Sequence, residues 1–414
     1  MRIRFLIVLF FSCSSVSIAQ FTNSTWSPYS LFGFGKFNDA NTGVTNSLGK
    51  AGVAMFSEYE INGLNSASLA RINRGSFFFD IGLKTEFNTY GNRSDTDTKQ
   101  TIYNFSNLSF AFPVGKKSGV SISLLPFTEV GYFFQGIVTD IEGSNIGTYS
   151  NINGKGGLNS FNVSYGRLIN ESLSLGFSAK YFFGSIEQTE TLLLDDELLS
   201  LQDVNYYKGF KFELGLQSQL TPKLTTGLTL NFPSILNGSK DRVVNRIVDN
   251  IATTIDETDG IEIKDYETPF DFTVGFKLNN GNFSFLADYK RTFWSSTGIE
   301  DNIGEYTDSN VFGFGMEYYK RDNNLLKQKS KFRYRFGLNY DDGNLRVNGN
   351  KISNSSITTG IGIPFGKSYN TYMNFSYSFG SKGIVSNTLV RENYHVLTLN
   401  LSFEDLWFRK RLID

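Results

Sequence analysis

Side chains that commonly carry catalysis or bind metals are scarce in this sequence of 414 residues. It contains one histidine, His395, and one cysteine, Cys13. His395 shares its alternation with Leu397 and Leu399, so on a strand it would lie on the apolar face. A membrane-wall phospholipase would need a serine, a histidine and an amide side chain there, but a histidine without catalytic function is the more ordinary interpretation. We therefore expect no enzyme, with no catalytic residues, no cofactor and no metal site.

Two apolar clusters are better candidates for a binding site. One surrounds the acidic run Asp195–Glu197, which could hold a hard cation but is more simply a solvated loop. Its apolar members are Leu192, Leu193, Leu194, Leu198 and Leu199. The other comprises Val244, Ile247, Val248, Ile251 and Ile255, whose spacing predicts an amphipathic helix. Exposed apolar surface of this kind is normally covered. Either the two segments cover each other as a lid, or they capture a ligand that covers both.

The first 19 residues have the features of a secretory signal peptide. Arg2 and Arg4 precede the apolar run Phe5–Phe11, and Ser17–Ala19 fits a cleavage site. We expect cleavage after Ala19, and lipidation at Cys13 is the alternative. Beyond this segment, no apolar run approaches the roughly 20 residues that a transmembrane helix needs.

The composition excludes a nucleic-acid partner and contains an unusual number of aromatic residues. The net charge is −1 and the isoelectric point is near 6.1, so there is no basic footprint for nucleic acid. Forty phenylalanines, 21 tyrosines and 40 glycines do not suit an ordinary soluble domain, although the mean hydropathy is only −0.22.

Strict alternation of apolar and polar residues dominates the chain from residue 75 to 414. In Leu173–Phe183, for example, the odd positions are apolar and the even positions are Ser, Gly or Lys, apart from Phe182. This period predicts β-strands with one apolar and one polar face. Fourteen such segments occur, near residues 76–87, 103–112, 118–126, 160–168, 173–185, 208–220, 224–232, 269–278, 282–290, 310–318, 331–340, 355–363, 371–379 and 394–403.

The connections between these segments favour a membrane barrel. After the first strand they alternate between long ones, such as Phe127–Ser160 and Pro233–Glu267, and short ones, such as Pro113–Lys117 and Ile169–Ser172. A β-sandwich gives no reason for that alternation, whereas outer-membrane barrels have tight periplasmic turns and long extracellular loops. We predict an all-β fold: a transmembrane antiparallel β-barrel of about fourteen strands, located in the outer membrane.

Residues 20–74 precede the first strand and show no ten-residue alternation. A disordered tail is one interpretation of this segment. A folded hatch that plugs the lumen is the one we favour, because a barrel this wide must be filled.

Two short motifs resemble the hatch signature of FadL/TodX-type outer-membrane transport proteins. They are Leu48–Ala54, where Lys50 replaces a glycine, and Asn65–Ala70, where Ser66 replaces a proline. The resemblance implies that Asn65, Ser66, Ala67 and Leu69 belong to a hatch motif. The chain end, Phe403–Asp414, is similar to that of Bacteroidota members of this family.

The resemblance implies passive uptake of hydrophobic molecules of the fatty-acid or hydrocarbon class. The two apolar clusters would then capture ligand outside the cell, and release would occur laterally through the barrel wall. Pro126 cannot donate to a sheet ladder, so it marks either a candidate lateral exit or a plain strand end. The expected partners are outer-membrane lipid, a hydrophobic small molecule and other outer-membrane proteins.

A companion subunit of a large secretion or assembly complex is the alternative function. The altered hatch motif favours it. So do the charges expected on the lumenal face, which come from Lys211, Glu213, Arg333 and Arg335. A transporter needs a continuous apolar path, whereas a companion barrel needs a sealed lumen.

Overall fold

The structure is a computed structural model that describes residues 25–40, 42–57, 60–91, 98–140, 147–194, 197–249, 251–299, 304–320, 332–365, 371–385 and 389–406. The predicted signal peptide, its cleavage site and Cys13 lie outside the described residues. Among the described residues, no helix is long and apolar enough to cross a membrane.

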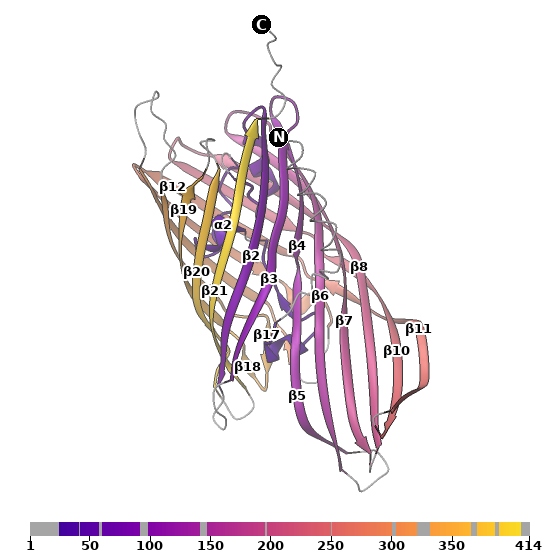
Figure 1. Cartoon of the computed structure of the whole chain (residues 1–414). Coiled ribbons are helices and arrows are strands. Elements are labelled where there is room, and N and C mark those ends of the chain that lie inside the picture. Colours follow the sequence, from indigo (N-terminus) through magenta and orange to yellow (C-terminus); the bar gives the residue numbers. More distant parts are fainter. Residues whose placement is uncertain are drawn as a thin grey trace, which may run out of the picture.

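Fourteen antiparallel strands close a barrel (Figure 1), which confirms the predicted fold class. The ring closes where the last strand pairs with the first, from Ser76↔Leu406 to Gly91↔Arg391. Every predicted strand coincides with one of these: β2 (Ser76–Gly91), β3 (Thr98–Pro113), β4 (Ser118–Pro126), β6 (Gly147–Leu168), β7 (Leu173–Leu194), β8 (Glu197–Gln219), β9 (Leu224–Asn231), β12 (Asp271–Asn280), β13 (Phe283–Thr292), β15 (Ser309–Tyr319), β16 (Arg333–Asp341), β19 (Asn354–Pro364), β20 (Tyr372–Lys382) and β21 (Arg391–Leu406).

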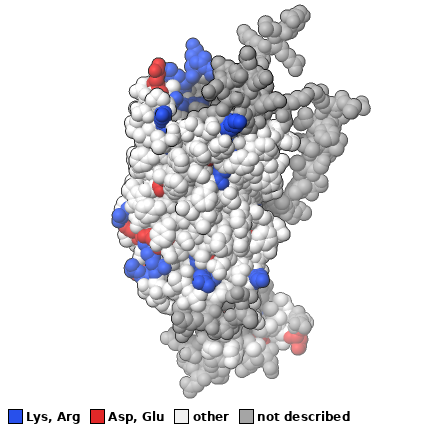
Figure 2. All heavy atoms as spheres, turned by 90° about the vertical axis from the view of Figure 1, so that its left-hand side faces the viewer, with Lys and Arg blue, Asp and Glu red and all other residues white. Residues whose placement is uncertain are grey.

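The burial pattern of the wall is that of a membrane barrel. On β7, Leu175 and Phe177 face outward and are more than 40% exposed, whereas Ser174 and Ser178 face inward and are buried. Figure 2 shows one side of the wall as mostly uncharged across its middle. Lipid provides no hydrogen-bond partners, so a spanning sheet must pair all its strands and expose apolar side chains.

Three further strands, β5 (Thr128–Asp140), β10 (Ser234–Val248) and β11 (Ile251–Thr268), join the long ends of β6, β7 and β8. Together they form an antiparallel sheet that projects beyond the rest of the barrel (Figure 1). We call this projecting sheet the blade; it comprises the described residues of 130–158, 184–208 and 237–265. It leaves the barrel at the end with the long connections, which is extracellular in outer-membrane barrels.

The predicted amphipathic helix at residues 244–255 is wrong. Val244–Val248 belong to β10, Asp249 turns with φ 50°, and Ile251 begins β11. Valine, isoleucine and threonine dominate this stretch and favour strands. Pairing of β10 with β8, from Asn237↔Lys208 to Ile247↔Leu198, supplies the tertiary partner that local spacing cannot reveal.

The described residues of 25–71 lie inside the barrel (Figure 1), and we call them the hatch. The hatch contains only short elements: η1 (Pro28–Leu31), β1 (Lys36–Phe37), α2 (Gly43–Asn46) and η2 (Ser66–Arg71). A small sheet of β14 (Gly304–Tyr306), β17 (Leu345–Val347) and β18 (Asn350–Lys351), with η3 (Trp294–Ser296), packs over its first part.

Candidate functional site

Asn65 of the predicted hatch motif is fully buried and joins the hatch to the wall. Its Oδ1 accepts a hydrogen bond from the Ala67 N–H at 3.0 Å and so caps η2. Its Nδ2 donates to the Val53 carbonyl at 3.0 Å and to the Leu216 carbonyl of β8 at 3.1 Å. One amide therefore satisfies backbone groups of two hatch segments and of a barrel strand.

Two wall side chains hold the hatch from the other side. Gln217 donates to the carbonyls of Val53 and Met55, both at 2.8 Å. Asp288 accepts hydrogen bonds from the N–H groups of Gly52 at 2.7 Å and Val53 at 2.9 Å. Bonds to a carboxylate are stronger than bonds between neutral groups, so these contacts fix the hatch firmly in the lumen.

Both departures from the FadL/TodX-type hatch signature bring new polar contacts. The Ser66 N–H donates to Glu213 Oε1 at 3.3 Å, which a proline could not do. Lys50 has φ 64°, a conformation that favours glycine, and its ammonium lies 2.9 Å from Asp39. The hatch therefore keeps the backbone shape that the signature implies and adds charged contacts to it.

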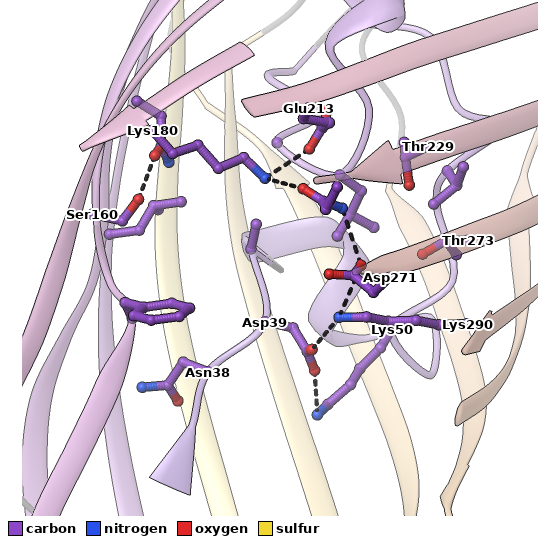
Figure 3. A pocket seen from close by; sticks show the side chains of 18 of the residues that line it. Asn38, Asp39, Lys50, Ser160, Lys180, Glu213, Thr229, Asp271, Thr273 and Lys290 are labelled. Atoms are coloured by element: carbon purple, nitrogen blue, oxygen red, sulfur yellow. Dashed lines mark hydrogen bonds and ion pairs between the residues drawn. The ribbon is translucent and has the colours of Figure 1, made fainter. Parts of the chain in front are cut away.

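Ion pairs line the central lumenal cavity, which has a volume of about 170 Å³ (Figure 3). Asp39 of the hatch lies 2.9 Å from Lys50 and 3.9 Å from Lys290 of β13. Across the cavity, Lys180 lies 2.7 Å from Glu213. Burial alone would raise the pKa of Asp39, but the charges of Lys50 and Lys290 outweigh it and hold this pKa at about 2.

A second group of ion pairs lies where the hatch meets β2 and β5. Lys36 of β1 lies 3.0 Å from Glu86, and Lys84 lies 2.7 Å from Glu129. Two further cavities, of about 160 and 210 Å³, also have Asp39 and Lys50 in their walls. Paired charges therefore interrupt the apolar lining of these cavities, which includes Leu125, Phe127 and Phe182.

The N-terminal part of the hatch, residues 25–37, lies in the extracellular half of the lumen, and we call it the strap. Its aromatic side chains are buried in two clusters. Tyr29 and Phe32 pack with Trp294 and the small sheet. Phe34 packs among residues of β5, β6, β7 and β10, which are Val130, Tyr132, Leu158, Phe182, Ile186 and Leu236. The chain itself thus occupies the apolar space above the charged cavities.

Pro126 lies at an interruption of the barrel wall. β3 pairs with β4 only from Leu108↔Leu124 to Pro113↔Gly119, and past Pro126 the chain continues as β5. Among the described residues, β5 pairs with β6 and with β1 of the strap, and not with β3.

The strap covers the interruption from inside. Ser30 Oγ bonds both the N–H and the carbonyl of Gly131, each at 3.0 Å. A Cβ atom at Gly131 would overlap the Thr25 carbonyl oxygen, so only glycine allows this close approach.

The blade separates the predicted capture residues onto two faces. By register, the inner face, which continues the lumenal surface, carries Leu192, Leu199, Val244, Val248 and Ile251. The outer face carries Leu193, Leu198 and Ile247. The side chain of Leu194, together with Asp195 and Asp196, lies outside the described residues.

His395 lies on the outer wall as predicted. Its ring accepts or donates a 2.6 Å hydrogen bond with the Tyr377 hydroxyl and packs 5.0 Å from the Phe379 ring. Among the described residues, no group of three or more His, Cys, Asp and Glu side chains is placed to hold a metal ion.

Sequence reasoning missed the ion pairs made by Lys36, Asp39, Lys84 and Lys290. The alternation does assign Lys84 and Lys290 to the lumenal face of their strands, so the sequence could have predicted their inward direction but not their partners. Lys36 and Asp39 lie in the hatch, where no periodicity reveals which way a side chain points.

Comparisons with known proteins agree on the fold. The monoaromatic hydrocarbon channel CymD is 18% identical, with a TM-score of 0.60, and the match covers 90% of this chain and 100% of that one. The toluene transporter TodX of P. putida is 16% identical, with a TM-score of 0.62 and coverages of 89% and 99%. The toluene transporter TbuX of Ralstonia pickettii is 17% identical, with a TM-score of 0.59 and coverages of 87% and 97%. A search of curated proteins finds no match.

These identities are low, so the FadL/TodX-type resemblance holds for the barrel fold, which is that of outer-membrane channels. Family membership comes from a different comparison. The family model described as BamG matches residues 1–414. Because that match spans the whole sequence, the chain belongs to the BamG family.

Proposed function

We propose that this protein is a non-transporting companion subunit of a large outer-membrane protein complex. The observation that carries the proposal is the occupation of the lumen by the strap together with the charged lining of the remaining cavities. The strap buries Tyr29, Phe32 and Phe34 in the apolar space at the extracellular end. Below it, the cavities are lined by ion pairs such as Lys180–Glu213. A hydrophobic ligand would have to displace the aromatic side chains of the strap and remove water from the ion pairs. Removing water from ion pairs costs free energy.

Two further features support a subunit role. The blade extends well beyond the barrel and offers a large surface outside the membrane. The match to the BamG family model also favours a subunit over a channel that works alone.

Uptake of hydrophobic molecules is the second candidate function. The interrupted wall at Pro126 and the fold shared with hydrocarbon channels favour it. In that role the inner-face residues of the blade, Leu192, Leu199 and Val244 among them, would capture ligand. The strap would then have to leave its site to open a lateral route past Pro126.

Purification from outer membranes in mild detergent tests the leading proposal. We expect one or more partners to co-purify in stoichiometric amounts with the tagged protein. A lone barrel that carries bound lipid would contradict the subunit role and favour transport.

Replacing Val244 and Ile251, which both lie on the inner face of the blade, with aspartate tests the second candidate. If the blade captures ligand, uptake of fatty acids or toluene should be lost while heat-modifiable gel mobility, the mark of a folded barrel, is kept. The variant Gly131→Leu, which displaces the strap, should then raise uptake. If neither change alters uptake, the transport proposal fails.

A further inference from the structure

The blade is a single layer of sheet, and its last strand is the most exposed part. Every residue of β11 from Ile251 to Gly260 is exposed to solvent. Ile251 is 69% exposed and Ile255 56%. A sheet normally buries at least one face against a second layer, so an uncovered blade implies a covering partner.

The blade is also acidic near this strand. β11 contains six acidic residues and one lysine, although the whole chain has a net charge of only −1. Glu257 and Glu262 of β11 lie on the outer face by register, together with Asp241 of β10. Tyr206 of β8, which is 43% exposed, lies on the same face. Asp241 lies beside it, and Glu262 lies across β10 from it, because Ser239 pairs with both Tyr206 and Glu262. Partial burial and the charges of Asp241, Asp259 and Glu187 raise the pKa of Tyr206.

The partner does not add a strand to the edge of β11. Three register shifts each place an extra residue on β11, near Ile255, Gly260 and Lys264. Bulges of this kind twist an edge away from further pairing, and edge charges add to that protection. A partner must therefore contact the face of the blade rather than its edge.

Lipid is a poor occupant of this face. Anionic headgroups attract basic protein segments and repel acidic ones. The carboxylates on this face instead attract arginine and lysine side chains of a partner, because complementary charges steer association and set specificity. Tyr206 adds an exposed tyrosine, a residue type that is enriched at protein interfaces.

We infer that the outer face of the blade, centred on Tyr206, Asp241, Glu257 and Glu262, is the docking surface for a basic surface of a partner protein. The inference rests on the proposed subunit role and specifies the surface and the partner chemistry.

The test is a triple charge reversal, Asp241→Lys, Glu257→Lys and Glu262→Lys, in the full-length protein. Partner retention in mild detergent should fall about tenfold or more, since complementary charges steer and stabilise such contacts. The matched control, Glu190→Lys, Asp249→Lys and Asp256→Lys, makes the same charge change elsewhere on the blade. It should retain the partner. Heat-modifiable gel mobility reports that both variants are folded.

A photo-crosslinker locates the contact. Placed at position 206, it should join to a lysine- or arginine-rich peptide of the partner, and at position 253 on the inner face it should not. Reversing those partner residues to glutamate should restore binding to the triple variant.

The outcomes separate the two proposals. If the wild-type protein co-purifies with nothing, the subunit role itself fails. If the wild type keeps a partner but the triple reversal keeps it equally, or if the crosslinked peptide is not basic, only the docking surface is wrong.

Discussion

Strands β7 and β8 run from the barrel wall, which faces lipid, into the blade, which faces water. Comparing these two halves shows how each surrounding determines which side chains the strands expose. In the wall, the outward positions of β7 include Leu175 and Phe177. In the blade, the same outward row continues as Glu187, Thr189 and Thr191. Backbone pairing with β8 is continuous across the boundary, from Leu173↔Ser218 to Leu194↔Glu197. The outward side chains therefore change from apolar in lipid to polar in water, while the backbone hydrogen bonding between the two strands continues unchanged.

Closure also differs between the two regions. The wall closes on itself, because β21 pairs with β2, and the strap covers its interruption at Pro126 from inside. The blade ends at β11, which among the described residues pairs only with β10 and carries three bulges. A sheet in lipid must close on itself, whereas a sheet in water can protect its edge with bulges and charge.

The largest expected effect comes from placing a charge on the outward row of the wall. Phe177→Arg should lower the free energy of unfolding by about 2–4 kcal/mol, because arginine is costly near the middle of the bilayer. Thr189→Arg, on the same face of the same strand but in the blade, should change it by less than about 0.5 kcal/mol. Urea unfolding in lipid vesicles, followed by tryptophan fluorescence, measures both. Equal effects would show that the blade is not outside the membrane.

The next largest difference in stability is expected between Asn65, whose side-chain amide is buried, and Asn245, whose side chain is partly exposed. Asn65→Ala removes the groups that satisfy the hatch and the wall, and we expect a loss of about 1–3 kcal/mol in the free energy of unfolding. Asn245→Ala in the blade removes an exposed hydrogen bond to Thr254 and should have little effect. The same urea titration compares them, and a neutral Asn65→Ala would mean that the hatch is not anchored by this residue.

The ion pairs of the blade should contribute less to the free energy of unfolding than Asn65 does. Asp203 accepts two hydrogen bonds from Arg242, both at 2.6 Å, but the Arg242 side chain is 37% exposed. Asp203→Asn should therefore lower the free energy of unfolding by about 1 kcal/mol or less. Raising the salt concentration to about 1 M should remove most of that difference, since salt screens exposed charges. A difference that survives high salt would point to a buried role.

The smallest expected effect is the pH response of the hatch. The pKa of Asp39 in the folded protein is about 2, below the ordinary value near 4. A depressed carboxylate pKa stabilises the fold above about pH 4, and this contribution is lost as the pH falls toward 2. The side chain keeps 36% of its surface open to the lumen, so we expect less than about 1 kcal/mol.

The Asp39→Asn variant is the control for this response. The urea midpoint of the wild type should fall more than that of the variant between pH 5 and pH 3. Identical pH profiles would exclude Asp39 as the titrating group.

Alternation alone predicted all fourteen barrel strands and the inward direction of Lys211, Glu213, Arg333 and Arg335, which are all buried in the lumen. The hairpin of β10 and β11 was missed because Val244, Ile247, Val248 and Ile251 also fit the helical period. In that stretch the local pattern is ambiguous, and the pairing of Ile247 with Leu198, far away in sequence, decides between helix and strand.

The sequence by itself determined the barrel, because in lipid every backbone group must be paired and each strand must alternate at period two. It also determined the cap of η2, since the Asn65 side chain accepts a hydrogen bond from the Ala67 N–H only two residues away. Only the tertiary structure decided that the strap packs inside the lumen against the interrupted wall and that the blade carries a separate acidic face. The position of the strap depends on contacts between residues far apart in the sequence, such as Ser30 with Gly131. The outer face of the blade depends on the pairing of β10 with both β8 and β11, and no local pattern encodes such contacts.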